Sequence, residues 1–184
     1  MTAIGSLVPR YEVYSIDECF ADLTGMEGDL TVLGQQTRAR VERWVGIPTC
    51  VGIGPSKTLA KFCNHLAKRH AKLAGVLDWD SLTPERQARA LASEPVSEVW
   101  GIGRKLSVQL ADMGISTALD LARTEPAQIR RRFGVVVERV LRELHGISCL
   151  TLEEVAPVRQ QLARSRSFSE RVWTAPAPVG NPAL

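Results

Sequence analysis

Two adjacent carboxylates, Asp17 and Glu18, stand between two apolar, strand-like runs in the stretch Tyr14-Ser15-Ile16-Asp17-Glu18-Cys19-Phe20. Neighbouring carboxylates repel each other and are costly to desolvate, and a divalent cation, usually Mg²⁺, is the natural compensation. In phosphoryl transfer, carboxylates hold two Mg²⁺ ions about 3.5–4 Å apart, which bridge the attacking and leaving oxygens. Taken alone, the dipeptide is more typical of a solvated acidic turn, so a metal site depends on what accompanies it.

A second group, Gly54-Pro55-Ser56-Lys57, lies where a predicted strand passes into a helix. A helix N-terminus offers free backbone N–H groups and a positive dipole potential, and both suit a phosphate. Lys57 would add a full positive charge there, although a lysine in the first turn is otherwise mildly unfavourable. The spacing of a Walker A loop is absent. An ordinary exposed lysine explains this pattern equally well.

The third group is a glycine–hydrophobic–glycine turn, Gly101, Ile102 and Gly103, which is followed by Arg104 and Lys105. Short helical patterns flank it on both sides, so the segment resembles a helix-hairpin-helix motif. The glycines allow the backbone to approach a DNA phosphate, and the two basic side chains stand beside the N–H donors. Such contacts position DNA without reading its sequence. We favour DNA binding over a plain αα-corner, because a corner needs only one glycine.

The remaining chemistry-bearing residues form no recognisable site. The four cysteines contain no CxxC pair, which argues against zinc and for reduced thiols. His65, His70 and His145 have no metal-ligand spacing, and we expect no catalytic histidine. The run Arg130-Arg131-Arg132 ends a predicted helix, where the helix dipole favours cations, so a structural role suffices.

Strands alternating with helices are expected to position the first two groups. Residues 11–23 predict a β-hairpin with the two carboxylates at its bend, where both can converge on one metal. The alternation predicts an α/β sheet with helices packed on it. The elements expected downstream are a helix capped by Asp29, a strand at 49–54, a helix capped by Ser56 and a strand at 76–79.

From residue 80 the pattern changes to short helices punctuated by glycine, and Thr83-Pro84-Glu85 is a strong helix start. The overall prediction is therefore an α+β fold with an α/β part followed by an all-α part. A proline-rich segment at the end is expected to be disordered. The expected helices are 84–93, 104–113, 117–123, 126–133 and 135–145, and the expected parts are 1–79, 80–149, a connector at 150–172 and a tail at 173–184.

The length, composition and net charge of the chain exclude few classes of protein. A chain of 184 residues with 45% apolar content suits one or two small domains with a packed core. The net charge of +3 (23 basic minus 20 acidic residues) permits nucleic-acid binding without arguing for it. The sequence shows no signal-peptide pattern and no apolar stretch of 18 residues. We therefore expect a cytoplasmic protein that does not span a membrane.

In this order and spacing, the three groups resemble the Y-family translesion DNA polymerases, and most closely the UmuC type, the catalytic subunit of bacterial DNA polymerase V. The resemblance implies a partial palm with a ferredoxin-like α/β sheet over 1–79 and a helix-hairpin-helix thumb over 80–149. The connector would lead toward a little-finger domain. The resemblance runs from about Pro9 to Val172, and its most specific marks are Tyr14-Ser15-Ile16-Asp17-Glu18, Ser56-Lys57-Thr58-Leu59-Ala60-Lys61, Val99-Trp100-Gly101-Ile102-Gly103-Arg104 and Ser165-Arg166-Ser167-Phe168.

The resemblance also implies an activity, which is error-prone nucleotidyl transfer past DNA damage in the SOS repair response. Asp17 would ligate Mg²⁺, and Glu18 would lie beside the metal and the primer 3′ end. Lys57 would contact the incoming dNTP, and the turn Gly101–Lys105 would grip the duplex backbone. The implied partners are primer-template DNA, a UmuD′-like subunit and the RecA filament.

Members of this family carry a first metal-binding Asp and a fingers segment ahead of the matched region, and only ten residues precede Tyr11. We therefore expect a chain truncated at both ends that binds metal weakly and is not catalytically competent alone. Two alternatives stay open: a non-catalytic module for DNA or protein binding, and a decayed fragment without a stable fold. Intact Asp17, Glu18 and Lys57 favour a recent truncation over a pure binding module.

Overall fold

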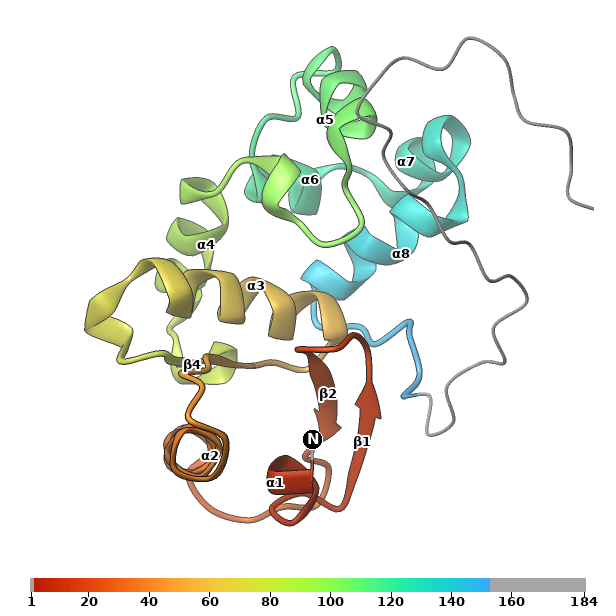
Figure 1. Ribbon diagram of the computed structural model, residues 1–184. Coiled ribbons are helices and arrows are strands. Elements are labelled where there is room, and N and C mark those ends of the chain that lie inside the picture. The colour runs from red at the N-terminus through yellow and green to blue at the C-terminus, as the bar shows by residue number, and fades with distance from the viewer. Residues whose placement is uncertain (1, 153–184) are drawn as a thin grey trace, which may run out of the picture.

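A computed structural model describes residues 2–152 of the chain (Figure 1). Helices and two small sheets make up this part, so the α+β prediction is confirmed. The predicted tail at 173–184, and the predicted connector from residue 153 onward, lie outside the described residues. Figure 1 shows two levels, with the first two helices and the strands at the bottom and the helices α4 to α8 above them.

The predicted β-hairpin is confirmed. Strand β1 (Arg10–Val13) pairs antiparallel with β2 (Cys19–Asp22). The first strand ends where the amides of Tyr14 and Ser15 both donate to the carbonyl oxygen of Glu18, at 3.0 Å each, which turns the chain. A short helix that the pattern did not predict, α1 (Thr2–Gly5), packs beside helix α2.

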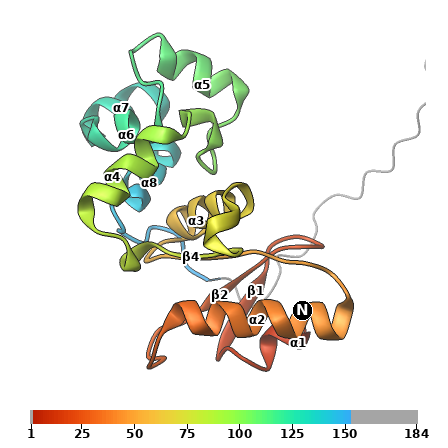
Figure 2. The same ribbon diagram turned by 90° about the vertical axis from the view of Figure 1, so that its left-hand side faces the viewer.

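A small parallel sheet lies between two helices, as Figure 2 shows. Helix α2 (Leu30–Val45) begins at the predicted cap Asp29, and helix α3 (Lys57–Arg69) begins at the predicted cap Ser56. Strand β3 (Val51–Ile53) pairs with β4 (Val76–Asp78). At Gly52 a Cβ atom would lie 2.1 Å from the carbonyl oxygen of Ala60, so only glycine allows β3 to approach α3 this closely.

The expectation of one ferredoxin-like sheet needs a correction. The four strands form two separate two-stranded sheets, β1–β2 and β3–β4, over the residues that the structure describes. The reason is that the hairpin docks on α3 through side chains, whereas a continuous sheet would require backbone hydrogen bonds between the two strand pairs.

The all-α part follows the predicted pattern closely. Helix α4 begins at Pro84 after Thr83, and the remaining helices fall within a few residues of the predicted ranges. Three short 3₁₀ turns, at Ala71–Leu73, Trp79–Ser81 and Val96–Glu98, connect the elements. The helices are α4 (Pro84–Ser93), α5 (Arg104–Ala111), α6 (Ala118–Arg123), α7 (Pro126–Phe133) and α8 (Val135–Leu144).

One hydrophobic core spans the predicted boundary at residue 80. It contains Leu59 and Phe62 of α3 together with Leu110, Leu121 and Leu141 from the later helices, all at most 2% exposed. The division into domains stays a prediction, but α3 packs directly on α8. None of the helices in the described part is long and apolar enough to cross a membrane.

Candidate functional site

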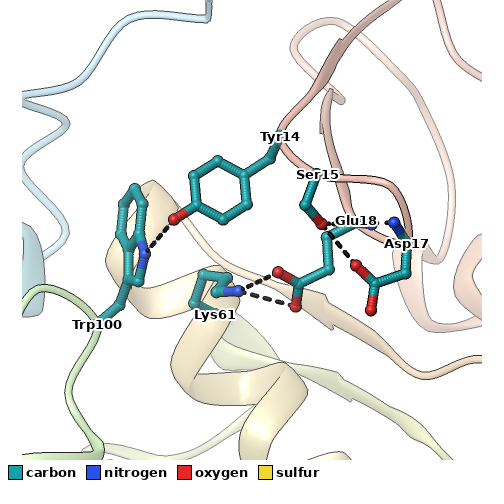
Figure 3. Close-up of polar contacts among 6 residues, drawn as sticks. All are labelled: Tyr14, Ser15, Asp17, Glu18, Lys61 and Trp100. Carbon is teal, nitrogen blue, oxygen red and sulfur yellow. Dashed lines mark hydrogen bonds and ion pairs between the residues drawn. The ribbon is translucent and has the colours of Figure 1, made fainter. Parts of the chain in front are cut away.

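The bend of the hairpin presents the two predicted carboxylates on one turn (Figure 3). The hydroxyl of Ser15 donates to Oδ1 of Asp17 at 2.6 Å and accepts from the amide of Glu18 at 3.1 Å. Asp17 is exposed, and this hydroxyl bond is the main reason that its pKa is lowered. Asp17 is therefore ionised at neutral pH and accessible.

Helix α3 meets the hairpin with two lysines one turn apart. The ammonium group of Lys61 lies 2.8 Å from both carboxylate oxygens of Glu18, and Lys57 forms an ion pair with Glu12 of β1. The Lys57 ammonium also lies 5.0 Å from the ring centroid of Phe20. Because the side chains of Lys57 and Glu12 are only 12% and 13% exposed, this pair is more than a solvated surface contact.

An aromatic cluster joins the hairpin to the predicted helix-hairpin-helix turn. The rings of Tyr14, Phe20 and Trp100 lie with their centroids 5.6 Å apart in each pair. The indole Nε1 of Trp100 donates to the hydroxyl of Tyr14 at 3.2 Å (Figure 3). Trp100 directly precedes Gly101, so the cluster places the glycine turn next to the strands that carry the carboxylates.

The N-terminus of α3 differs from the expectation of free backbone donors. The amide and hydroxyl of Thr58 both donate to Oε2 of Glu143, at 2.9 and 2.6 Å, and the amide of Leu59 donates to the hydroxyl of Ser56 at 3.2 Å. Glu143 belongs to α8 and is fully buried. Because a protein carboxylate already bonds to this helix N-terminus, the Lys57 ammonium is the feature left to attract a phosphate there.

Compared with the N-terminus of α3, most of the turn at residues 101–105 is exposed to solvent. Gly101 has φ +91°, a conformation that favours glycine, and Ile102 is buried in the core. Gly103 caps α5 without a side-chain hydrogen bond, and Gly103, Arg104 and Lys105 are exposed. The first turn of α5 therefore offers backbone donors and two basic side chains to solvent.

Three of the residues for which the sequence indicated no site, Arg130, His65 and His145, have contacts within the fold. Arg130 pairs with the buried Glu138 at 3.1 Å. His65 Nε2 lies 2.9 Å from Glu94, and His145 Nε2 lies 2.7 Å from the carbonyl oxygen of Ala122. These contacts connect elements of the core.

The hairpin carboxylates fit a divalent cation in part. Asp17 supplies an exposed, ionised oxygen donor, which is the ligand type that Mg²⁺ prefers. Glu18 is tied to Lys61, so it would ligate only with that contact loosened. Over residues 2–152, no cluster of three histidine, cysteine, aspartate or glutamate side chains could enclose a metal. A cation at this bend would need further oxygen ligands from elsewhere, such as substrate phosphates.

Sequence reasoning missed the residues that hold the site together. Lys61, four residues after Lys57, was not named as a site residue, although this spacing places both lysines on one side of the helix. Nothing in the sequence around Glu12 indicates that it pairs with Lys57, and nothing around Trp100 indicates that it bonds to Tyr14. The burial of Glu143 is equally invisible, because helical spacing alone cannot distinguish a buried glutamate from one at the edge of an apolar face.

Comparisons with known proteins point to the family that the sequence motifs resemble. The impB/mucB/samB family model matches residues 1–65. Protein UmuC of Salmonella typhimurium is 49% identical over 94% of this chain, and protein SamB of the same species is 46% identical over 95%. The chain covers 41% and 42% of these two proteins, so it spans about two fifths of the length of the curated relatives it matches.

The fold is also shared with solved structures. A Y-family DNA polymerase chimera, Dbh-Dpo4(243-245)-Dbh, aligns with a TM-score of 0.65 over 85% of this chain and 45% of that one, at 24% identity. The sequence relation to UmuC and SamB and the fold relation to the chimera agree. The chain is therefore similar to the UmuC-type proteins over about two fifths of their length, and it shares its fold with a Y-family DNA polymerase.

Proposed function

We propose that this chain supplies the palm and thumb parts of an error-prone translesion DNA polymerase, and that it binds primer-template DNA. The observation that carries the proposal is the docking of the hairpin on α3, which gathers Asp17, Glu18 and Lys57 within one small region. The relation to UmuC supports it. The alternative of a non-catalytic module is less favoured, because the similarity covers the hairpin as well as the thumb.

Asp17 and Glu18 are proposed as oxygen ligands for a divalent cation, Mg²⁺ in the proposed reaction. When bound, such a cation neutralises the charge that develops on a transferring phosphoryl group. Asp17 needs no proton removed, because the hydrogen bond from Ser15 keeps its pKa low. Glu18 would hold the cation only with its contact to Lys61 released, and the Lys61 ammonium would then be open to an anion beside it.

Lys57 is proposed to contact the triphosphate of an incoming dNTP. Its ammonium pairs with Glu12, so nucleotide binding exchanges a carboxylate for a phosphate at the same nitrogen. Both partners are anions, and the exchange keeps the buried lysine charge compensated throughout.

Duplex DNA is proposed to contact the open first turn of α5. The backbone N–H groups after Gly103 and the side chains of Arg104 and Lys105 suit one phosphate of the backbone. Such contacts are independent of base sequence, as copying of any template requires. By family resemblance, a UmuD′-like subunit and the RecA filament are the proposed protein partners.

The test combines DNA binding with primer extension on undamaged and abasic templates. We expect the chain to bind primer-template DNA with an affinity that falls as salt rises. Extension with Mg²⁺ or Mn²⁺ is expected to be weak or absent, because the described residues offer only two carboxylates at the bend. Any extension should disappear in Asp17→Ala and persist in Glu27→Ala, which removes an exposed carboxylate elsewhere.

Two outcomes would contradict this proposal. A folded chain without salt-sensitive DNA binding would reject the assignment of α5 to the DNA backbone. Extension that survives in Asp17→Ala would reject the role of the hairpin carboxylates.

A further inference from the structure

Glu143 is the most deeply embedded charged side chain among the described residues. Its side chain belongs to α8 and is 0% exposed. The carboxylate accepts hydrogen bonds from the amide and hydroxyl of Thr58 and from the amides of Cys149 and Leu150, at 2.6–3.1 Å. Four donors from two separate chain segments thus converge on this one carboxylate, which compensates the cost of burying it.

The position of these donors in the sequence is informative. Ser56 donates through its hydroxyl to the backbone carbonyl oxygen of Glu143 at 2.7 Å, and Thr58 donates to its carboxylate. Lys57 lies between these two residues. The backbone on both sides of Lys57 is therefore anchored to a residue 85 to 87 positions later in the chain.

We propose that Glu143 is a positioning residue for Lys57. It fixes the first turn of α3 so that the Lys57 ammonium faces Glu12 of the hairpin, and it holds the lysine where the incoming triphosphate would lie. The second half of this statement rests on the proposed function, whereas the first half concerns only the geometry of the chain.

A purely structural role for Glu143 predicts something different. The loss of a carboxylate that only stabilises the fold would loosen α3 as a whole, since Lys57 and Lys61 share that helix and face the same hairpin. A positioning role predicts a change confined to the first turn. Lys61 is therefore an internal reference, because no described contact connects it to Glu143.

The experiment measures the modification rate of individual lysines with a limiting amine-reactive acetylating reagent, read by mass spectrometry after digestion with a protease that does not cleave at lysine. In the wild-type chain Lys57 should react slowly, because its side chain is largely buried and ion-paired. In Glu143→Gln, which removes the charge but keeps the size, we expect the Lys57 rate to rise several-fold while the Lys61 rate stays unchanged.

The matched control is Glu94→Gln. Glu94 is also a buried glutamate, but it contacts His65 and Arg69 near the other end of α3. We expect it to leave the Lys57 rate unchanged. An equal rise at Lys57 and Lys61 in Glu143→Gln, or the same Lys57 rise in both variants, would overturn the proposal.

A milder variant keeps the test informative if Glu143→Gln does not fold. Thr58→Val removes the hydroxyl donor and keeps the amide donor, and we expect a smaller rise that is again specific to Lys57. An unchanged Lys57 rate in this variant and in folded Glu143→Gln would also overturn the proposal.

The same measurement with Mg²⁺ and dNTP separates the two claims. Protection of Lys57 by nucleotide in the wild type, reduced in Glu143→Gln, supports both. Absence of nucleotide protection rejects the proposed nucleotide contact, and the ratio of Lys57 to Lys61 rates in the variants then decides the positioning role by itself.

Discussion

Helices α3 and α5 both begin after a glycine-containing turn and both carry basic residues in the first turn, yet their N-termini are built in opposite ways. At α3 the donors are bonded within the protein, by Ser56 and by the buried Glu143. At α5 the cap is Gly103, which contributes no side-chain bond, and the first turn is exposed.

If both N-termini bind phosphates as proposed, the difference separates two ways of doing so. At α5, backbone donors and flexible basic side chains act together, which suits the regular phosphates of a DNA backbone. At α3 the helix dipole already faces a carboxylate, so Lys57 would act as a single charge in the proposed phosphate contact. A glycine-rich turn followed by lysine therefore does not by itself identify an open anion site.

The largest effect should come from removing the carboxylate that accepts hydrogen bonds at the N-terminus of α3. Glu143→Ala leaves buried donors of Thr58 and the amides of Cys149 and Leu150 without their acceptor, and we expect a loss of about 3 kcal/mol in the free energy of unfolding. Urea denaturation checks this. A loss no greater than that of an exposed substitution such as Glu27→Ala would show that α3 does not need this acceptor.

The next largest effect concerns the exposed N-terminus of α5. The double variant Arg104→Ala/Lys105→Ala removes two exposed cations, and we expect about tenfold weaker binding to duplex DNA near 0.1 M salt with unchanged unfolding. The slope of log affinity against log salt should fall by about two. Fluorescence anisotropy over a salt series measures both quantities. An unchanged slope would remove α5 from the DNA interface.

The two glycines of the turn provide a matched pair. Gly101 has φ +91° and a Cβ there would lie 3.2 Å from Val140, so Gly101→Ala should lower the free energy of unfolding by about 1 kcal/mol. Gly103 has φ −80° and open space around it, so Gly103→Ala should change stability very little. Thermal unfolding compares the two. Equal losses would contradict the left-handed conformation assigned to Gly101.

The smallest effect concerns the hairpin that faces α3. Hydrogen bonds from Thr24, and the ion pair with Arg10, lower the pKa of Asp22 from 3.8 to about 2. Because the folded-state pKa is depressed, its contribution to stability is present above about pH 4 and is lost as pH falls toward 2. Asp22→Asn should be less stable than the wild type at pH 5, with a gap that closes near pH 2. A constant gap would assign the effect to packing.

Much of the local structure was predictable from short-range signals. Asp29 and Ser56 cap their helices, Thr83 and Pro84 start α4, and Asp17 and Glu18 lie at the hairpin bend. Each of these features depends on residues within a few positions of one another, where caps, prolines and apolar spacing act directly on the backbone. The roles of the two carboxylates and of Lys57 remain predictions.

Apart from the short helix α1, the sequence by itself determined the order of the main helices and strands, the caps of α2 and α3, and the three groups on which the resemblance to the UmuC type rests. Only the tertiary structure decided which of those groups are open to a ligand. The Lys57–Glu12 pair, the Trp100–Tyr14 bond and the burial of Glu143 join residues 45, 86 and 85 positions apart. Such contacts depend on how whole elements pack. Burying a charged group is costly unless hydrogen-bond donors surround it, and here several of those donors come from residues far away in the sequence.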